Sequence, residues 1–293
     1  MSSSEEGQDT EDRLGAEAYL RPLITSFISN IGYTTAPVIS DGTYWSALHQ
    51  HAINTVYVGI YTWLAVVIDD VACRSLEDFE PFHERFASGK PQPTVFLEAW
   101  AGIIQSAFDY WDPMVANFIV AASLDLHNAC VLEARSELRR LVRTKGGQSL
   151  AWYMRSKSGL ADAYAYFTFP KAVYPDISCF LEAIPDMSAY FCLANDVLSF
   201  YKEEKAKEKD NYINYRAYYE GNDPRTVLGE VIGQTQNAVK RMRVVVKGRE
   251  PYEQALNNHI LGYVAFHTLS DRYMLSEIGL GEDAFSVVNG KVL

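Results

Sequence analysis

The stretch 195-NDVLSFYKEEKAKEKD-210 places an amide, a hydroxyl and an acid at fixed intervals between an apolar segment and a dense run of charge. Asn195, Ser199 and Glu203 are spaced by four. Each residue turns an α-helix by about 100°, so each step of four advances the direction by only ~40° and the three side chains line one face. Their oxygens suit a hard cation. They suit Mg2+ best, because it accepts few protein ligands and keeps waters or substrate phosphates.

A competing interpretation is that this helix simply turns polar as it leaves the core. That interpretation accounts for the residues after Glu203, where lysines and glutamates can form solvated pairs along a helix. It accounts poorly for Asn195 and Ser199, which are modest helix formers flanked by apolar residues. We therefore expect Asn195 to Glu203 to be a metal-binding face, followed by a solvated exit from the helix.

A second acidic position follows the apolar segment 55-TVYVGIYTWLAVVI-68, where Asp69 and Asp70 are adjacent. Two acids at the C-terminal end of a helix oppose its dipole, and a bound divalent cation would offset that cost. Alternatively, the acids mark only where the helix reaches water. The segment has 14 residues against the ~20 that a membrane-spanning helix needs, so we predict a buried core helix and no membrane span. Its β-branched residues would also suit a buried strand.

The composition is that of a soluble globular protein of 293 residues with a net charge of -11, which argues against a nucleic-acid surface. Four cysteines are scattered without a C-x-x-C pair, as expected for reduced thiols and a cytoplasmic localisation. Residues 1–13 are polar and acidic and lack the order of a secretory signal, so they are predicted to be a disordered tail. The remaining residues, 14–293, are predicted to form one domain.

Glycine and proline fall mainly between long mixed segments, at Pro37, 90-KPQP-93, 146-GG-147, 221-GNDP-224 and 248-GREP-251. The intervals are too long for strands and suit helices. Apolar residues recur at helical spacing over 227–246, and a second stripe of leucines and valines over 131–142 also has helical spacing. No nucleotide-binding glycine motif is found. The sequence therefore predicts an all-α fold.

Three stretches carry a resemblance to a known family: 195-NDVLSFYKE-203, 168-TFPK-171 and 262-GYVAFHTLSDRYML-275. Together with Asp69-Asp70, they resemble the class I terpene synthases, and within them the fungal trichodiene synthase-like sesquiterpene cyclases. The resemblance implies an all-α class I terpenoid synthase bundle around a central active-site cavity. It also implies a homodimer and three Mg2+ ions per active site.

The resemblance also assigns roles to individual residues. Those implied to bind metal are Asp69, Asp70, Asn195, Ser199 and Glu203. Those implied to bind the substrate diphosphate are Arg155, Lys202, Arg272 and Tyr273. Gly159 falls at the effector position of a helix break next to Arg155, and the catalytic set implied by the family is Asp69, Arg155, Gly159 and Tyr273.

Two positions depart from the family pattern. In 69-DDVAC-73 the fifth position, where the family usually has an acid, is Cys73. Ser158 takes the linker position before Gly159, where the family often has an acid or an amide. One ligating aspartate can suffice for the first motif, so neither departure removes the expectation of activity.

The implied reaction is the Mg2+-dependent ionisation and cyclisation of farnesyl diphosphate to a sesquiterpene hydrocarbon or alcohol, with release of diphosphate. The protein would exclude water, and aromatic faces would stabilise the carbocation. Aromatic residues make up 13% of the chain. We expect about a third of the following to line the pocket: Tyr57, Tyr61, Trp63, Tyr164, Phe167, Phe191 and Phe266.

Three alternatives stay open. A chain-elongating prenyltransferase would carry two aspartate-rich motifs, and the N-D-x-x-S-x-x-x-E form argues against it. A cyclase of the same fold could use another prenyl diphosphate. A non-catalytic helical protein could bind a prenyl diphosphate or a partner, with Cys73 as the sign of a degraded site.

Overall fold

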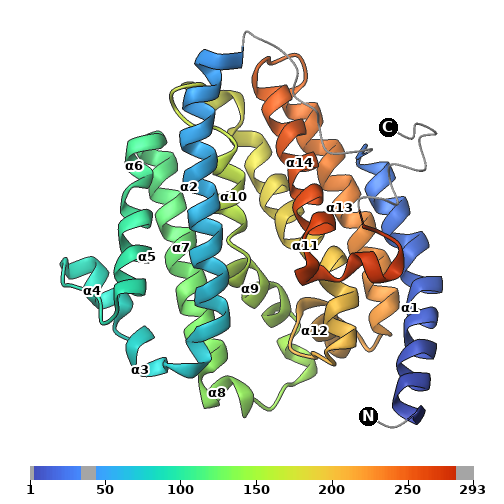
Figure 1. The fold of residues 1–293 in the computed structure, drawn as a ribbon. Coiled ribbons are helices and arrows are strands. Elements are labelled where there is room, and N and C mark those ends of the chain that lie inside the picture. The colour runs from blue at the N-terminus through green and yellow to red at the C-terminus, as the bar shows by residue number, and fades with distance from the viewer. Residues whose placement is uncertain (1–2, 34–43, 282–293) are drawn as a thin grey trace. The chain divides into compact units, whose positions relative to one another are not determined.

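The computed structural model describes residues 3–33 and 44–281, and every regular element in these ranges is a helix (Figure 1). The prediction of an all-α fold is therefore confirmed. The segment 55–68 lies inside a helix and not a strand, and Pro37 lies outside the described residues. The α-helices are α1 (Ser3–Asn30), α2 (Tyr44–Val71), α3 (Leu76–Phe79), α4 (Phe82–Ser88), α5 (Val95–Gln105), α6 (Ala107–Tyr110), α7 (Pro113–Ala134), α8 (Ser136–Arg139), α9 (Ser149–Ser158), α10 (Ala161–Phe167), α11 (Ile184–Lys205), α12 (Tyr212–Glu220), α13 (Pro224–Val246) and α14 (Tyr252–Leu269). Short 3-10 helices are η1 (Ala72–Arg74), η2 (Lys145–Gly147), η3 (Ile177–Cys179), η4 (Leu181–Ala183), η5 (Asp271–Tyr273) and η6 (Leu275–Ile278).

The contacts within the chain form two compact units. Unit 1 comprises Met1–Ile39 and Leu193–Leu293, and unit 2 comprises Ser40–Cys192. Helix α11 supplies residues to both, because the division falls between Cys192 and Leu193. Helix α1 begins at Ser3, within the segment 1–13 for which a disordered tail is predicted. The single domain 14–293 stays a prediction.

Unit 2 is built around α7, which packs against α2, α5, α9 and α10 (Figure 1). The sequence starts this helix clearly: Asp112 accepts a hydrogen bond from the backbone N–H of Met114 at 2.8 Å, and Pro113 occupies the first helical position. Beside it, aromatic rings stack edge to face, with Tyr57 4.8 Å from Trp111 and Tyr61 4.8 Å from Phe167 between ring centroids. An aromatic cluster therefore forms much of the core of unit 2.

The stripe predicted over 131–142 does not form one helix. Helix α7 ends at Ala134, and Arg135 takes an extended backbone conformation before the single turn of α8. Leu141 and Val142 follow that turn and are 45% and 84% exposed. The helical spacing of these apolar residues was therefore coincidental after residue 134.

Buried His127 of α7 gives unit 2 a pH-dependent stability. Its ring stacks on Phe82 at 4.1 Å, its Nε2 lies 2.9 Å from the Phe79 carbonyl, and burial lowers its pKa from 6.5 to about 4. Between these two values the unfolded chain binds the proton and the folded protein does not. Stability is therefore fully present above about pH 6.5 and falls as the pH drops toward 4.

We expect the free energy of unfolding to fall by about 2 kcal/mol more between pH 7 and pH 5 in the wild type than in His127→Gln. The glutamine amide can still donate to the Phe79 carbonyl but does not titrate. Urea titrations of both proteins at the two pH values give the comparison. An equal fall in both would contradict the assignment.

Unit 1 is built around α13, which packs against α1, α12 and α14 (Figure 1). The stretch 221-GNDP-224 separates two helices as predicted. Gly221 ends α12 in the left-handed conformation, Asp223 caps α13 by accepting from the N–H of Arg225 at 2.8 Å, and Pro224 opens the helix. The predicted apolar face of 227–246 is confirmed by five buried side chains: Val227, Val231, Ile232, Val239 and Met242.

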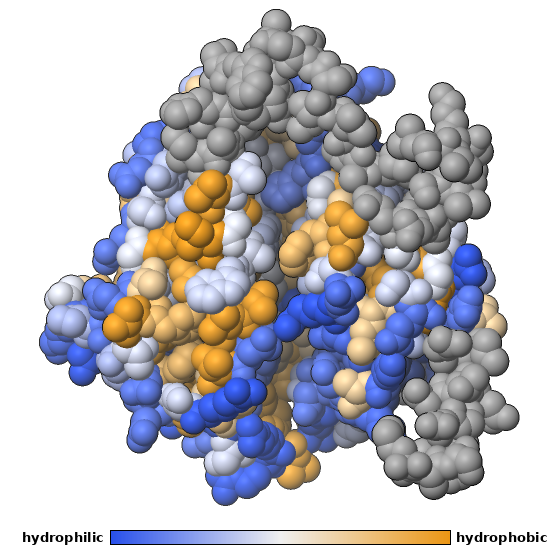
Figure 2. All heavy atoms as spheres, in the orientation of Figure 1, coloured by the Kyte–Doolittle hydropathy of each residue, from blue (hydrophilic) through white to orange (hydrophobic). Residues whose placement is uncertain are grey.

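Helix α2 carries an exposed apolar face. Val56, Ile60 and Trp63 recur at helical spacing and are 59%, 50% and 62% exposed, and Figure 2 shows apolar side chains gathered over this helix. Two helical spans, Thr55–Arg74 and Pro113–Ala134, have the length and composition to cross a membrane, and the first extends beyond the predicted apolar segment 55–68 through Asp69 and Asp70 to Arg74. Core helices of soluble proteins pass the same test, so this is weak evidence, and the absence of a membrane span stays a prediction.

Candidate functional site

The three residues predicted to form a metal-binding face all lie on α11. Ser199 is buried, Asn195 and Glu203 are half-buried, and the Ser199 hydroxyl donates to Glu203 Oε1 at 2.6 Å. This contact confirms that residues four apart share a face of the helix. Lys202 is half-buried and follows Asn195 by seven residues, which turns it back to within about 20° of the same direction.

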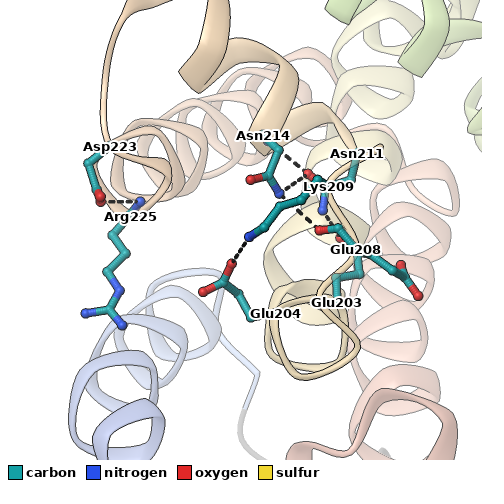
Figure 3. A network of polar contacts seen from close by, with 8 residues as sticks. All are labelled: Glu203, Glu204, Glu208, Lys209, Asn211, Asn214, Asp223 and Arg225. Atoms are coloured by element: carbon teal, nitrogen blue, oxygen red, sulfur yellow. Dashed lines mark hydrogen bonds and ion pairs between the residues drawn. The ribbon is translucent and has the colours of Figure 1, made fainter. Parts of the chain in front are cut away.

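The second oxygen of Glu203 is held from the following helix. Asn211 Nδ2 donates to Glu203 Oε2 at 2.8 Å, while Asn211 Oδ1 caps α12 by accepting from the N–H of Asn214 at 2.9 Å (Figure 3). The same side chain therefore fixes the start of α12 and the carboxylate of Glu203. Sequence reasoning missed Asn211, although an asparagine that precedes a helix is a recognisable capping signal.

The charge run beyond Glu203 is a helix end, as predicted. Lys207 adopts the left-handed conformation with φ of 57°, and the N–H of Glu208 donates to the carbonyl of Glu203 at 2.9 Å, which closes the last turn of α11. Lys209 pairs with Glu204 at 3.2 Å in a solvent-exposed contact (Figure 3). Such surface pairs contribute little to stability.

The other predicted residues of unit 1 follow α14. Tyr273 is buried on η5 and its ring lies 4.1 Å from the ring of His267 between centroids, whereas Arg272 is exposed. His267 Nε2 in turn lies 3.1 Å from Asn195 Nδ2. Asn195 and Tyr273, predicted from different motifs, therefore both contact His267, which sequence reasoning did not single out within 262-GYVAFHTLSDRYML-275.

A second contact joins α11 to the C-terminal elements of unit 1. Glu277 Oε2 accepts from the Tyr201 hydroxyl at 2.8 Å and from Lys205 Nζ at 2.7 Å. Glu277 lies on η6, close in sequence to the predicted diphosphate ligands Arg272 and Tyr273. The end of α11 is thus tied to the segment that carries them.

In unit 2, Asp69 and Asp70 lie in the last turn of α2 and both are exposed. The Cys130 thiol of α7 lies 3.9 Å from Asp69 Oδ1, and burial, followed by the Asp69 charge, raises the pKa of that thiol well above its usual value. Cys73, at the position where the family usually has an acid, is exposed on η1. The acids therefore stand where the helix ends, as predicted.

The helix break predicted at Gly159 is also present in unit 2. Helix α9 ends at Ser158, Leu160 takes the left-handed conformation with φ of 50°, and α10 begins at Ala161. Arg155 Nη2 donates to the carbonyl of Cys192 at 2.7 Å, and the Cys192 thiol lies 3.6 Å from the carbonyl of Arg155. A hydrogen-bonded pair therefore fastens the end of α9 to the backbone of α11.

The donor set on α11 fits Mg2+ by its chemistry. An amide oxygen, a hydroxyl and a carboxylate are hard ligands, and the 2.6 Å contact places the last two side by side. Within the described ranges, no group of three or more histidine, cysteine, aspartate or glutamate side chains could hold a metal ion. Only one of the three predicted ligands on α11, Glu203, belongs to these four residue types, so the three ligands do not count as such a group.

About a third of seven named aromatic residues are expected to line a pocket, and four of the seven, Tyr57, Tyr61, Tyr164 and Phe167, belong to the aromatic cluster of unit 2. Phe191 joins it through Tyr164, at 6.1 Å. The two remaining residues have other surroundings. Trp63 is 62% exposed and packs on Phe96, and Phe266 is 44% exposed in unit 1.

Comparison with known proteins gives consistent matches. The family model described as trichodiene synthase (TRI5) matches residues 34–285 of the chain. Longiborneol synthase CLM1 of Gibberella zeae is 40% identical over 256 residues, covering 86% of this chain and 73% of that protein. Terpene synthase BipA of Cochliobolus sativus is 41% identical over 229 residues, covering 78% and 70%. Monoterpene synthase 25 of Postia placenta is 33% identical over 272 residues, covering 90% and 76%.

Proposed function

This chain belongs to the trichodiene synthase family, and we propose that it is a sesquiterpene synthase that ionises and cyclises farnesyl diphosphate with release of diphosphate. The observation that supports this most directly is the oxygen-donor face of α11, where Ser199 and Glu203 are in hydrogen-bond contact and Asn195 lies one turn before Ser199. It occurs in a chain that is 40% identical to a longiborneol synthase. The enzyme is a terpene cyclase, a lyase.

The substrate is the finer part of the proposal. Farnesyl diphosphate follows from the resemblance to sesquiterpene cyclases. Similarity to a monoterpene synthase makes geranyl diphosphate the alternative substrate, because related pockets can accept prenyl chains of different length. The number of Mg2+ ions, three per active site, also rests on the family.

We assign the metal ligands as in the sequence: Asn195, Ser199 and Glu203 on α11, and Asp69 with Asp70 on α2. When bound, Mg2+ would supply positive charge that stabilises the departing diphosphate. Ser199 and Glu203 already lie within hydrogen-bond distance of each other, so little reorganisation is needed to present both oxygens to one cation.

The leaving group would be held by Arg155, Lys202, Arg272 and Tyr273, through charge-assisted hydrogen bonds to its oxygens. The allylic C–O bond breaks, the electron pair leaves with the diphosphate, and the carbocation remains on the prenyl chain. The aromatic cluster of unit 2 would keep water away and stabilise the positive charge, and the hydroxyls of Tyr57 and Tyr61 are occupied by hydrogen bonds inside the protein. No protein nucleophile is required.

Four other parts of the proposal have separate grounds. A homodimer rests on the resemblance alone, and one catalytic domain over 14–293 rests on the resemblance together with the helical pattern of the sequence. A cytoplasmic localisation rests on the scattered cysteines, and the lack of a nucleic-acid partner rests on the net charge of -11. The family match over residues 34–285 supports treating most of the chain as one catalytic unit.

The test is to incubate the purified protein with geranyl, farnesyl or geranylgeranyl diphosphate and Mg2+, measuring diphosphate release and volatile products. We expect the protein to turn over farnesyl diphosphate. The turnover rate should fall by at least about 100-fold when EDTA removes Mg2+, and it should recover when Mg2+ is added back. Turnover of geranyl diphosphate alone would refute farnesyl diphosphate as the substrate but would leave the proposed reaction class in place. Binding of all three substrates without diphosphate release would refute the proposed enzymatic activity.

A further inference from the structure

His267 lies on α14 among aromatic rings and is only 1% exposed. Its ring centroid is 4.1 Å from that of Tyr273 and 4.6 Å from that of Tyr263, and Phe266 packs against it edge to face at 5.4 Å. These contacts restrict the orientation of the imidazole plane. Its two nitrogens therefore have fixed directions.

The backbone decides which ring nitrogen carries the proton. His267 Nδ1 lies 2.8 Å from the carbonyl oxygen of Tyr263, one turn earlier on the same helix. A carbonyl can only accept, so Nδ1 is the donor. In the neutral imidazole, Nε2 is then an acceptor, because one ring nitrogen donates and the other accepts.

The acceptor at Nε2 in turn orients the amide of Asn195. Asn195 Nδ2 lies 3.1 Å from His267 Nε2, and this pairing is possible only when the amide nitrogen faces the ring. A flipped amide would set the carbonyl oxygen against the lone pair of Nε2. Because the amide is planar, Oδ1 must be directed away from His267.

We propose that His267 is a positioning residue for the metal site, holding the Asn195 amide so that its oxygen and not its nitrogen is presented to Mg2+. The inference rests on the proposed function, since it takes Asn195 as a metal ligand. The terminal torsion of asparagine is broad and nearly two-fold, so without an acceptor the amide would populate both orientations. The same imidazole contacts Tyr273, so one side chain supports both the metal-binding face and the C-terminal Arg-Tyr pair.

The variants follow from the geometry. His267→Phe keeps an aromatic ring against Tyr273 and removes both ring nitrogens. His267→Gln restores an acceptor, because its Oε1 lies as many bonds from Cβ as His267 Nε2 does. Thr268→Val is the matched control on the same turn: Thr268 is buried, and among the described residues its hydroxyl bonds only to carbonyls of its own helix, those of Val264 and Ala265.

The readout is the affinity for Mn2+ in the presence of inorganic diphosphate, measured by electron paramagnetic resonance with no prenyl substrate. We expect His267→Phe to lose 10- to 100-fold in affinity, as is typical for partners of metal ligands. His267→Gln should stay within about fivefold of the wild type, and Thr268→Val within about twofold. In an Asn195→Ala background, His267→Phe should cost less than about twofold more, because it acts through Asn195.

Three results separate the hypotheses. If the wild type binds Mn2+ and His267→Phe binds it equally well, His267 has no positioning role while the proposed function stands. If His267→Phe weakens Mn2+ binding by the same factor with and without Asn195, its effect is general and the inference is wrong. A wild type that binds no Mn2+ would overturn the metal role and the inference together.

A measurement on the wild type covers the case in which His267→Phe does not fold. In protein labelled with 15N-histidine, the shifts of the His267 ring nitrogens distinguish the two tautomers. We expect the proton on Nδ1, before and after Mg2+ and inorganic diphosphate are added. A proton on Nε2 would contradict the proposed orientation of Asn195.

Discussion

Asn195→Leu is expected to lower kcat/KM for the prenyl diphosphate by at least about 1,000-fold, roughly 4 kcal/mol of transition-state stabilisation. Leucine keeps the size of asparagine and removes the oxygen that is proposed to hold Mg2+. It also removes the contact with His267 Nε2 at 3.1 Å, which should cost about 1 kcal/mol of stability. Steady-state kinetics at saturating Mg2+, with a urea titration beside them, separate the two effects.

The control for this variant is Glu204→Gln on the same helix. Glu204 pairs with Lys209 in solvent and lies outside the predicted face, so its loss should change kcat/KM by less than about threefold. Activity of Asn195→Leu within threefold of the wild type would show that the face of α11 holds no catalytic metal.

Gly159→Ala should be the second severe substitution, although glycine here has an ordinary negative φ of -82°. A Cβ at this position would lie 2.7 Å from Cys192 Sγ, 3.0 Å from the carbonyl oxygen of Arg155 and 3.1 Å from Arg155 Nη1. The sulfur and the guanidinium would have to shift, and both belong to the pair that fastens α9 to α11. We expect a loss of 1–3 kcal/mol in stability, which is typical of overpacking, and at least about 100-fold in kcat/KM as Arg155 moves.

Adding Cys192→Ala should partly reverse the effect of Gly159→Ala. It removes the sulfur atom closest to the new Cβ, so the double variant Gly159→Ala/Cys192→Ala should recover about half of the lost free energy of unfolding. Gly102→Ala in α5 is the matched control, since a Cβ there meets nothing within 4 Å and alanine favours a helix by about 0.5–1 kcal/mol. If the double variant is no better than Gly159→Ala, the sulfur contact is not the cause.

Local signals in the sequence predict much of the fold. The buried stripe over 227–246 and the stop-and-start signal at 221-GNDP-224 correspond to α13 and its boundary, because periodicity and capping depend on neighbouring residues. The same reasoning was wrong over 131–142. There the apolar residues have helical spacing, but the chain leaves the helix after Ala134 and exposes Val142.

The candidate site, like the fold, could be predicted from the sequence only in part. Spacing alone placed Asn195, Ser199 and Glu203 on one face, because four residues make about one turn. It could not find His267, which reaches Asn195 across 72 residues, nor the hydrogen bond from Arg155 to the carbonyl of Cys192 across 37. Such contacts depend on how helices pack, and no periodicity along the chain encodes them.

The exposed thiol of Cys73 offers a chemical handle for following the enzyme. Cys130 and Cys192 are buried, so after Cys179→Ser a thiol-reactive fluorophore should attach selectively at Cys73. That label would stand four residues from Asp69, in the acidic motif where the family usually has a carboxylate. Its emission would then report the arrival of a cation at Asp69 in real time, before any prenyl chain is consumed.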